Sequence, residues 1–397
     1  MTTRATRAGR YIRQPGGFLA FVPEPLPPSP PIHVGSTLLQ VLSRADQALG
    51  RLDGVIQTMP NPDLFVAMYV RREAVLSSQI EGTQSTLEDL LAVELEPQIQ
   101  DLARDVDEIV NYVAAMNYGL ERLATLPLSL RLIREIHRQL LEGVRGGHRL
   151  PGEFRRDQNF IATAGIRDIH EATFVPPPVP DMHRTLDNLE KFLHSRRDVP
   201  PLLHVGLAHA QFETIHPFMD GNGRVGRLLI TFLLVHHGVL HRPVLYLSLY
   251  LKRHRDEYYD RLMSIRNNGD WEGWLEFFVR GVAETAEEAT AKAPTIVRLR
   301  EDERARVQEH GLAANALRVL DLLFERPLVN VNLVATSIGV SFATANKLID
   351  QLERIGIVAE ITGRRRDRLF RHGPYLMLFG EEETKPLPAE TQTTLQS

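Results

Sequence analysis

Apolar residues recur at three- and four-residue spacing through most of the chain, and this period constrains the fold more than any other feature. It begins near Thr37, as in LLQVLSRADQALGRL, and continues to about residue 285. Such spacing places the apolar side chains on one face of a helix, whereas strand patterns are sparse. We therefore expect a mainly α body, with helices that include 102–123, 128–142, 202–214 and 224–237.

Two segments interrupt this helical pattern. Residues 1–35 contain the run VPEPLPPSPPIHV, and proline lacks an amide donor and restrains the residue before it, so we expect an extended arm. The segment from Phe160 to Val175 mixes glycine, proline and β-branched residues, which favours a β-hairpin flap.

A separate pattern begins after the polar stretch at 290–311. Two short apolar helices, a turn at Gly339, a longer helix and two short strands follow in the order of a winged helix-turn-helix. We assign this domain to 296–375 and expect a disordered tail at 376–397, which is polar.

Composition excludes several classes of protein. The chain has 397 residues, no cysteine and a net charge of −4, so disulfides, thiolate catalysis and Cys-ligated metals are ruled out and any basic patch must be local. The start has no apolar signal region and there is no stretch of 18 apolar residues, so we expect a cytoplasmic protein without a membrane partner.

The string TIHPFMDGNGRVGR, residues 214–227, concentrates the chemistry of the chain between two apolar helices. Its glycines let backbone amides approach a ligand at the start of a helix, where free amides and the helix dipole favour an anion such as phosphate. Asp220 offers the hard oxygen that Mg²⁺ requires. His216 can accept a proton at neutral pH.

Other interpretations of this string fit less well. GNGRVG matches the dinucleotide fingerprint, but a helix precedes it and Tyr246 stands where that fold needs an acidic residue. A phosphate loop of the Walker type needs a Gly-Lys-Ser/Thr sequence that does not follow. A purely structural turn would explain the glycines but not the histidine, aspartate and two arginines beside them.

HPFMDGNGRVGR resembles the signature of the Fic family, H-P-F-x-D/E-G-N-G-R-x-x-R, with every fixed position present. SSQIEGT is similar to the family's inhibitory motif S/T-x-x-x-E-G/N, and the resemblance covers roughly residues 60 to 280. It implies an N-terminal helical region at 36–125 that carries the inhibitory helix, and a helical catalytic core with its flap at 126–285.

The resemblance implies transfer of AMP from ATP to a Ser, Thr or Tyr hydroxyl of a protein, with His216 as the general base and Asp220 as the Mg²⁺ ligand. Arg227 would contact the γ-phosphate. The remaining nucleotide-binding positions would be Gly221, Asn222, Gly223, Arg224, Val225 and Gly226 in the loop and Tyr258, Tyr259 and Asn267 on the adenine side.

The same resemblance implies autoinhibition, in which Ser77, Glu81 and Gly82 form the inhibitory motif and Glu81 pairs with Arg227 and displaces the γ-phosphate. Three alternatives stay open: another nucleotide, removal of AMP, and a DNA-binding regulator with a nucleotide-sensing core. The wing RRRDRLFRH could contact DNA phosphates, but the charges of the preceding helix cancel. Winged helices also dock proteins or form homodimers.

Overall fold

The computed structural model describes residues 2–59, 61–96, 105–144, 150–163, 165–195, 199–312, 314–364 and 366–380. The chain divides into two compact units, Met1–Pro294 and Thr295–Ser397. Most of the tail expected at 376–397 lies outside the described residues.

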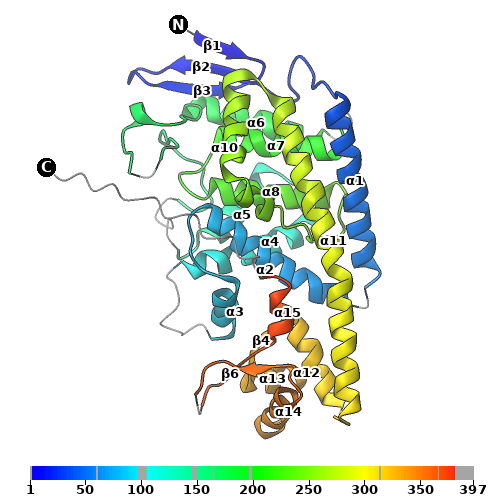
Figure 1. The fold of residues 1–397 in the computed structure, drawn as a ribbon. Helices are drawn as coiled ribbons and strands as arrows, with labels where there is room; N and C mark the ends of the chain where they lie inside the picture. The colour runs from blue at the N-terminus through cyan, green and yellow to red at the C-terminus, as the bar shows by residue number, and fades with distance from the viewer. Residues whose placement is uncertain are drawn as a thin grey trace, which may run out of the picture. The chain divides into compact units, whose positions relative to one another are not determined.

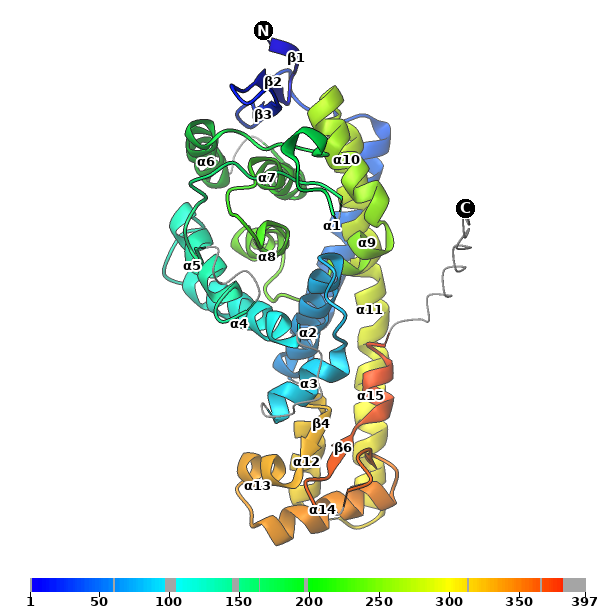
Figure 2. The same cartoon turned by 90° about the vertical axis from the view of Figure 1, so that its left-hand side faces the viewer.

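Two antiparallel neighbours, α7 (Pro201–Ile215) and α8 (Asn222–His236), form the centre of the N-terminal unit. Figure 2 looks along them and shows other helices arranged around the pair. Every residue of α7 after Pro201 is buried, so this helix is enclosed on all sides and has no solvent-exposed face. The helices that pack on the pair are α2 (Pro62–Ile80), α4 (Val106–Leu123), α5 (Leu130–Leu140), α6 (Val179–His194) and α10 (Arg255–Asn268).

The remaining helices of this unit complete a mainly α body, as the periodicity predicts. One difference concerns the polar stretch at 290–311, which the sequence suggests as a break between patterns. It is helical up to Glu309, and Pro294 lies inside that helix. These further helices are α1 (Ser36–Gln57), α3 (Leu87–Leu95), α9 (Ser248–Arg253) and α11 (Trp271–Glu309), which extends into the second unit.

The N-terminus differs from the extended arm expected at 1–35. Strands β1 (Thr2–Thr6), β2 (Gly9–Arg13) and β3 (Leu19–Pro23) form an antiparallel meander, with Tyr11 opposite Phe21. Figure 1 shows it beside α6, α7 and α10. Pro15 stands in the turn before β3, Pro23 at its end and the other prolines after it, so they remove no hydrogen bond from the interior of the sheet.

The expected flap is present in a reduced form. Ile161 and Phe174 exchange two backbone hydrogen bonds of 2.8 and 3.0 Å, and a short 3₁₀ helix (Ile169–Glu171) lies in the loop between them. This isolated bridge replaces the two strands of a regular hairpin. The flap therefore depends on its neighbours for its shape.

The C-terminal unit confirms the winged helix. Helices α12 (Ala314–Glu325), α13 (Val331–Ile338) and α14 (Phe342–Arg354) are followed by a small sheet, and Gly339 takes the left-handed conformation with φ 69° in the turn before α14. Asn330 and Ser341 cap the two later helices with their side chains. The sheet has the order β4–β6–β5, made of β4 (Leu328–Asn330), β6 (Leu369–Arg371) and β5 (Ala359–Glu360), and α15 (Gly373–Met377) ends the unit.

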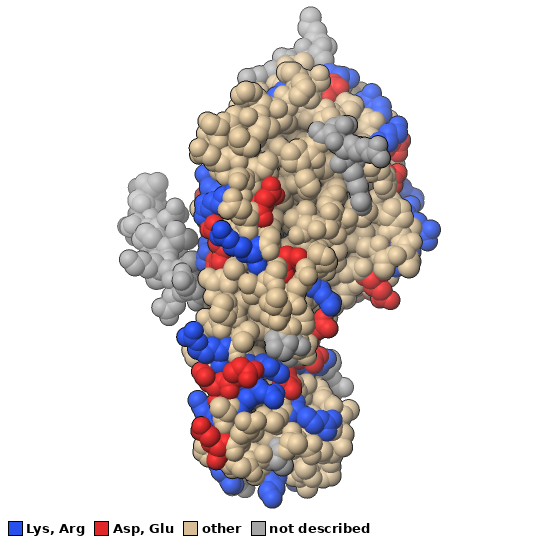
Figure 3. Space-filling view, turned by 90° about the vertical axis from the view of Figure 1, so that its right-hand side faces the viewer, with Lys and Arg blue, Asp and Glu red and all other residues tan. Residues whose placement is uncertain are grey.

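Within the described residues, no helix is long and apolar enough to cross a membrane. On the face drawn in Figure 3, acidic and basic side chains are intermixed rather than gathered into one patch of a single sign. This pattern agrees with the small net charge of −4.

Candidate active site

The loop between α7 and α8 places His216 at the end of one central helix and a row of amides at the start of the other. His216 has left-handed backbone angles, φ 48° and ψ 61°, and Gly221 has φ 77° just before α8. Asn222 closes the turn, since its side chain accepts from the Phe218 amide at 2.9 Å and donates to the Phe218 carbonyl at 2.8 Å. The loop is therefore rigid before any ligand binds.

His216 is held as a neutral imidazole. Burial lowers its pKa to about 3, and the positive charges of Arg266 and Arg155 act in the same direction. The ring is therefore unprotonated throughout the neutral range. A neutral imidazole can accept a proton, which is the state that a general base needs.

Two residues just before the flap, which sequence reasoning missed, hold this loop in place. Arg155 donates to the carbonyl of His216 at 3.1 Å, and its own amide donates to the Pro217 carbonyl at 2.9 Å. The Asn159 amide bonds the carbonyls of His216 at 3.2 Å and Phe218 at 2.8 Å. Both residues lie in the segment FRRDQNF, but nothing in that string identifies their partners.

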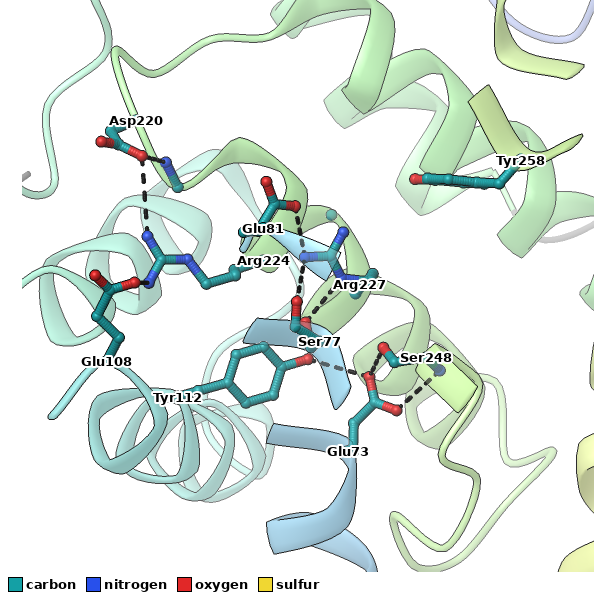
Figure 4. A network of polar contacts seen from close by, with 12 residues as sticks. Glu73, Ser77, Glu81, Glu108, Tyr112, Asp220, Arg224, Arg227, Ser248 and Tyr258 are labelled. Carbon is teal, nitrogen blue, oxygen red and sulfur yellow. Dashed lines mark hydrogen bonds and ion pairs between the residues drawn. The ribbon is translucent and has the colours of Figure 1, made fainter. Parts of the chain in front are cut away.

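Arg227 is a buried cation held by three side-chain hydrogen bonds. Its side chain is 2% exposed, and it donates from Nε to the Ser77 hydroxyl at 2.7 Å and from Nη2 to the Ser77 carbonyl at 3.0 Å. The same Nη2 donates to Oε1 of Glu81 at 2.7 Å (Figure 4). The two predicted motifs, 146 residues apart, therefore meet at one guanidinium.

Glu81 occupies the space directly above the glycine segment. A Cβ atom at position 223 would collide with Oε1 of Glu81, so only glycine permits this approach. Gly82 follows with φ 100° and ends α2 beside the carboxylate. Burial alone would raise the pKa of Glu81, but the charge and hydrogen bond of Arg227 outweigh it and hold the pKa below the ordinary value.

Arg224 points to the other side of the loop. It donates to Oε2 of Glu108 at 2.8 Å and lies 3.9 Å from Oδ1 of Asp220. The sequence gives no signal for Glu108, which comes from α4. The side chain of Val225 is buried and carries no polar atom, so only its backbone can bind a ligand.

Asp220 fits a role as a Mg²⁺ ligand. Its side chain is about one third exposed, and Oδ1 accepts from the Gly221 amide at 2.7 Å, which leaves Oδ2 without a hydrogen-bond partner among the described residues. Within that part of the chain, no group of three His, Asp or Glu side chains forms an all-protein metal site. A single carboxylate suits Mg²⁺, which takes its other ligands from phosphates and water.

A buried carboxylate stands behind the Ser77 contact. Glu73 accepts from the amide of Ser248 at 3.1 Å and from the hydroxyls of Ser248 and Tyr112 (Figure 4). Burial raises the pKa of Glu73 to about 7, although these hydrogen bonds and the charge of Arg227 oppose the shift. This network ties α2 to α4 and α9 one turn before Ser77.

The residues predicted on the adenine side already have other contacts. Tyr258 is buried, with its hydroxyl 2.9 Å from Nε2 of His209. Tyr259 is 39% exposed, with Arg255 5.6 Å above its ring. Asn267 accepts from the Tyr11 hydroxyl at 2.8 Å, so the structure joins it to the N-terminal sheet.

A helical core whose central loop carries this histidine, carboxylate and glycine segment defines the class of Fic-type folds. Residues 127–234 match the model of the Fic/DOC family and residues 39–121 match the Fic/DOC family N-terminal model. The chain therefore contains a Fic domain with its N-terminal region. Residues 317–370 match the model described as an HTH DNA binding domain.

Relatives and solved structures agree with this assignment. The Protein adenylyltransferase Fic of Aedes aegypti is 34% identical over 218 residues, which cover 52% of this chain and 38% of that protein. The Drosophila grimshawi protein of the same name is 32% identical over 217 residues, covering 52% of this chain and 39% of that protein. The chain thus spans about two fifths of these relatives.

A crystal structure of a Fic family protein from Desulfovibrio desulfuricans G20 superposes with a TM-score of 0.57 at 18% identity. The superposition covers 86% of this chain and 97% of that one. At this identity the likeness supports the fold alone.

Proposed function

We propose that the chain is a protein adenylyltransferase that transfers AMP from ATP to a Ser, Thr or Tyr hydroxyl of a protein, including itself, and that Glu81 inhibits it. One observation carries this proposal: the half-buried His216 and the amides at the start of α8 lie at the two ends of one short loop. The names of the relatives support the same activity.

The reaction needs a proton acceptor and an anion site. The target hydroxyl oxygen would form a bond to the α-phosphorus of ATP, the bond from that phosphorus to the bridging oxygen of the β-phosphate would break, and pyrophosphate would leave. His216 would take the hydroxyl proton. The amides that follow Gly221 and the Arg224 guanidinium would stabilise the phosphates.

Asp220 would hold Mg²⁺ when the nucleotide binds, and the ion would neutralise phosphate charge. Glu108 fixes the Arg224 guanidinium from the opposite side, at 2.8 Å. Arg224 is thus oriented by the protein before the nucleotide arrives, which reduces the ordering that binding has to supply.

Glu81 would act by occupying Arg227. The carboxylate fills the space above Gly223, and Arg227 cannot pair fully with both this group and a γ-phosphate. Ser77 holds the guanidinium in place whether or not Glu81 is present. Inhibition would therefore depend on the position of the end of α2.

The flap would hold the target by main-chain pairing. Ile161 uses its amide and carbonyl on Phe174, and strand geometry turns the backbone groups of Phe160 and Ala162 the other way. Those groups have no backbone hydrogen-bond partner among the described residues. An extended segment of a target could add to this edge beside His216.

Intact-mass measurement tests the activity against its alternatives. The Glu81→Gly chain would be incubated with each Mg-NTP in turn, and its mass compared with that of the His216→Ala chain as the matched control. A gain of one AMP from ATP alone, absent in the control, supports the proposal. A gain of another nucleotide, or loss of AMP from a modified protein, would favour the alternatives. No change in mass would refute the proposal.

A second candidate function rests on a groove in the C-terminal unit. The groove has a volume of about 710 Å³ and is lined by Asn332, Phe342, Asn346, Arg364 and Arg366. Phe342, the first residue of α14, is 58% exposed. Exposed aromatic and amide groups beside wing arginines suit duplex DNA.

Binding of the full chain to duplex DNA at several salt concentrations tests this candidate. Phosphate contacts predict affinity that falls steeply as salt rises. The absence of any salt-dependent shift would favour a protein-docking role for this domain.

A further inference from the structure

The N-terminal sheet, which precedes the matched family segment at 39–121, contacts the flap directly. The Phe21 amide of β3 donates to the Val175 carbonyl of the flap at 2.9 Å. At the neighbouring position, Phe174 exchanges two backbone bonds with Ile161. The segment Phe174–Val175 is therefore hydrogen-bonded to β3 on one side and to the outer part of the flap on the other.

Side chains reinforce this main-chain link. The Phe174 ring is buried. Its centroid lies 6.2 Å from the centroid of the Phe21 ring and 3.7 Å from the guanidinium carbon of Arg266. Arg266 in turn donates to the Thr214 hydroxyl at 3.2 Å and to the Glu213 carbonyl at 3.3 Å. Phe174 is thus connected both to the sheet and to the end of α7 that carries the candidate base.

The sheet is itself fixed to the helical body away from the flap. Arg7 donates to the Gly269 carbonyl at 2.9 Å and forms an ion pair with Glu272. The Tyr11 hydroxyl donates to Asn267 at 2.8 Å. These contacts give Asn267, which is expected on the adenine side, a partner in the sheet.

The flap has little structure of its own to resist bending. Its only ladder contact within the described residues is the bridge between Ile161 and Phe174, and an isolated pair of this kind is marginal in water. A strand on the other side of Phe174 adds the support that the bridge lacks. The edge at Phe160–Ala162 is then the one left for an added strand.

We propose that the sheet β1–β3 forms the fixed inner part of the target-binding surface, and that Phe21 is a positioning residue that holds the flap edge in register with His216. This inference rests on the proposed function, because the partner is an extended protein segment that carries a hydroxyl side chain. It assigns residues 2–23 to target binding and leaves nucleotide binding to the loop.

Phe21→Ala in the full chain tests the proposal, with Val22→Ala as the matched control. Val22 is the next residue of β3 and equally buried, but it points to the opposite face of the sheet. Amide hydrogen exchange at Ile161 and Phe174, referenced to α8, should become at least tenfold faster in Phe21→Ala and change little in Val22→Ala. Equal exchange in Phe21→Ala and the parent would overturn the proposal.

Kinetics in the Glu81→Gly background provide the second measurement, with a tagged His216→Ala copy of the chain as the protein target. Phe21→Ala should raise the KM for this target about tenfold and leave the KM for ATP unchanged. A parallel rise in both constants would also overturn the proposal. Absence of transfer in the Glu81→Gly parent would count against the proposed function, while the exchange result would still decide the link between sheet and flap.

Discussion

Removal of the Glu81 carboxylate is the perturbation with the clearest expected effect. Glu81 is the residue just after α2, and Gly82 already has φ 100°, so Glu81→Gly places no glycine inside the helix. The fold should therefore tolerate the change. The variant removes one partner of Arg227 and leaves both contacts with Ser77, so the guanidinium stays in place.

The magnitude follows from the pair that is lost. A hydrogen bond between charged groups contributes about 1.5–3 kcal/mol, and about 1.4 kcal/mol corresponds to a factor of ten. The Glu81 side chain is 36% exposed, so water screens its charge and the lower value applies. We expect AMP incorporation to rise about tenfold in Glu81→Gly. AMP incorporation by Glu81→Gln, which keeps the shape of the side chain without its charge, should lie between that of Glu81→Gly and that of the parent.

Initial rates of labelled AMP incorporation from Mg-ATP measure this series. The double variant Glu81→Gly with Arg227→Ala should show no gain, because the shared partner is gone. Equal rates in the parent and Glu81→Gly would refute autoinhibition. Activation of Glu81→Gly that persists without Arg227 would show that Glu81 acts through another group.

Four further expectations follow from the same geometry. His216→Ala in the Glu81→Gly background should lower transfer by about 10²–10⁴ while ATP still binds, and transfer at the parent rate would remove this base from the mechanism. Asp220→Asn should raise the Mg²⁺ concentration needed for half-maximal transfer, whereas an unchanged Mg²⁺ titration would place the ligand elsewhere. Burial raises the pKa of Glu81, but Arg227 lowers it by more, so the pKa in the folded protein is below the ordinary value. The carboxylate therefore loses its charge only when the pH falls through this lowered pKa. The ratio of rates between Glu81→Gly and parent should therefore stay constant from pH 8 to 5, and a collapse of this ratio within that range would contradict the ion pair. Replacing Arg364 and Arg366 by glutamate should weaken DNA binding and flatten its salt dependence, and unchanged binding would exclude the groove as the DNA site.

Features that depend on neighbours along the chain could be predicted from the amino-acid sequence. Helical periodicity predicted the mainly α body, and Gly339 marked the turn of the winged helix. The loop at 214–227 was recognisable because its histidine, carboxylate and glycines are adjacent in sequence. Such signals act within one or two turns of chain, where spacing alone fixes geometry.

Tertiary structure decided every contact made across long stretches of sequence. Glu108 contacts Arg224, which is 116 residues away in the sequence, and Tyr11 contacts Asn267, which is 256 residues away. No local sequence pattern identifies either pair. The N-terminal strands were missed for the same reason, since their pairing with one another and with the flap depends on the helices that support them. The packing of separate helices determines which polar groups come into contact. A buried polar group needs a hydrogen-bond partner, but that partner can be identified only when the packing is known.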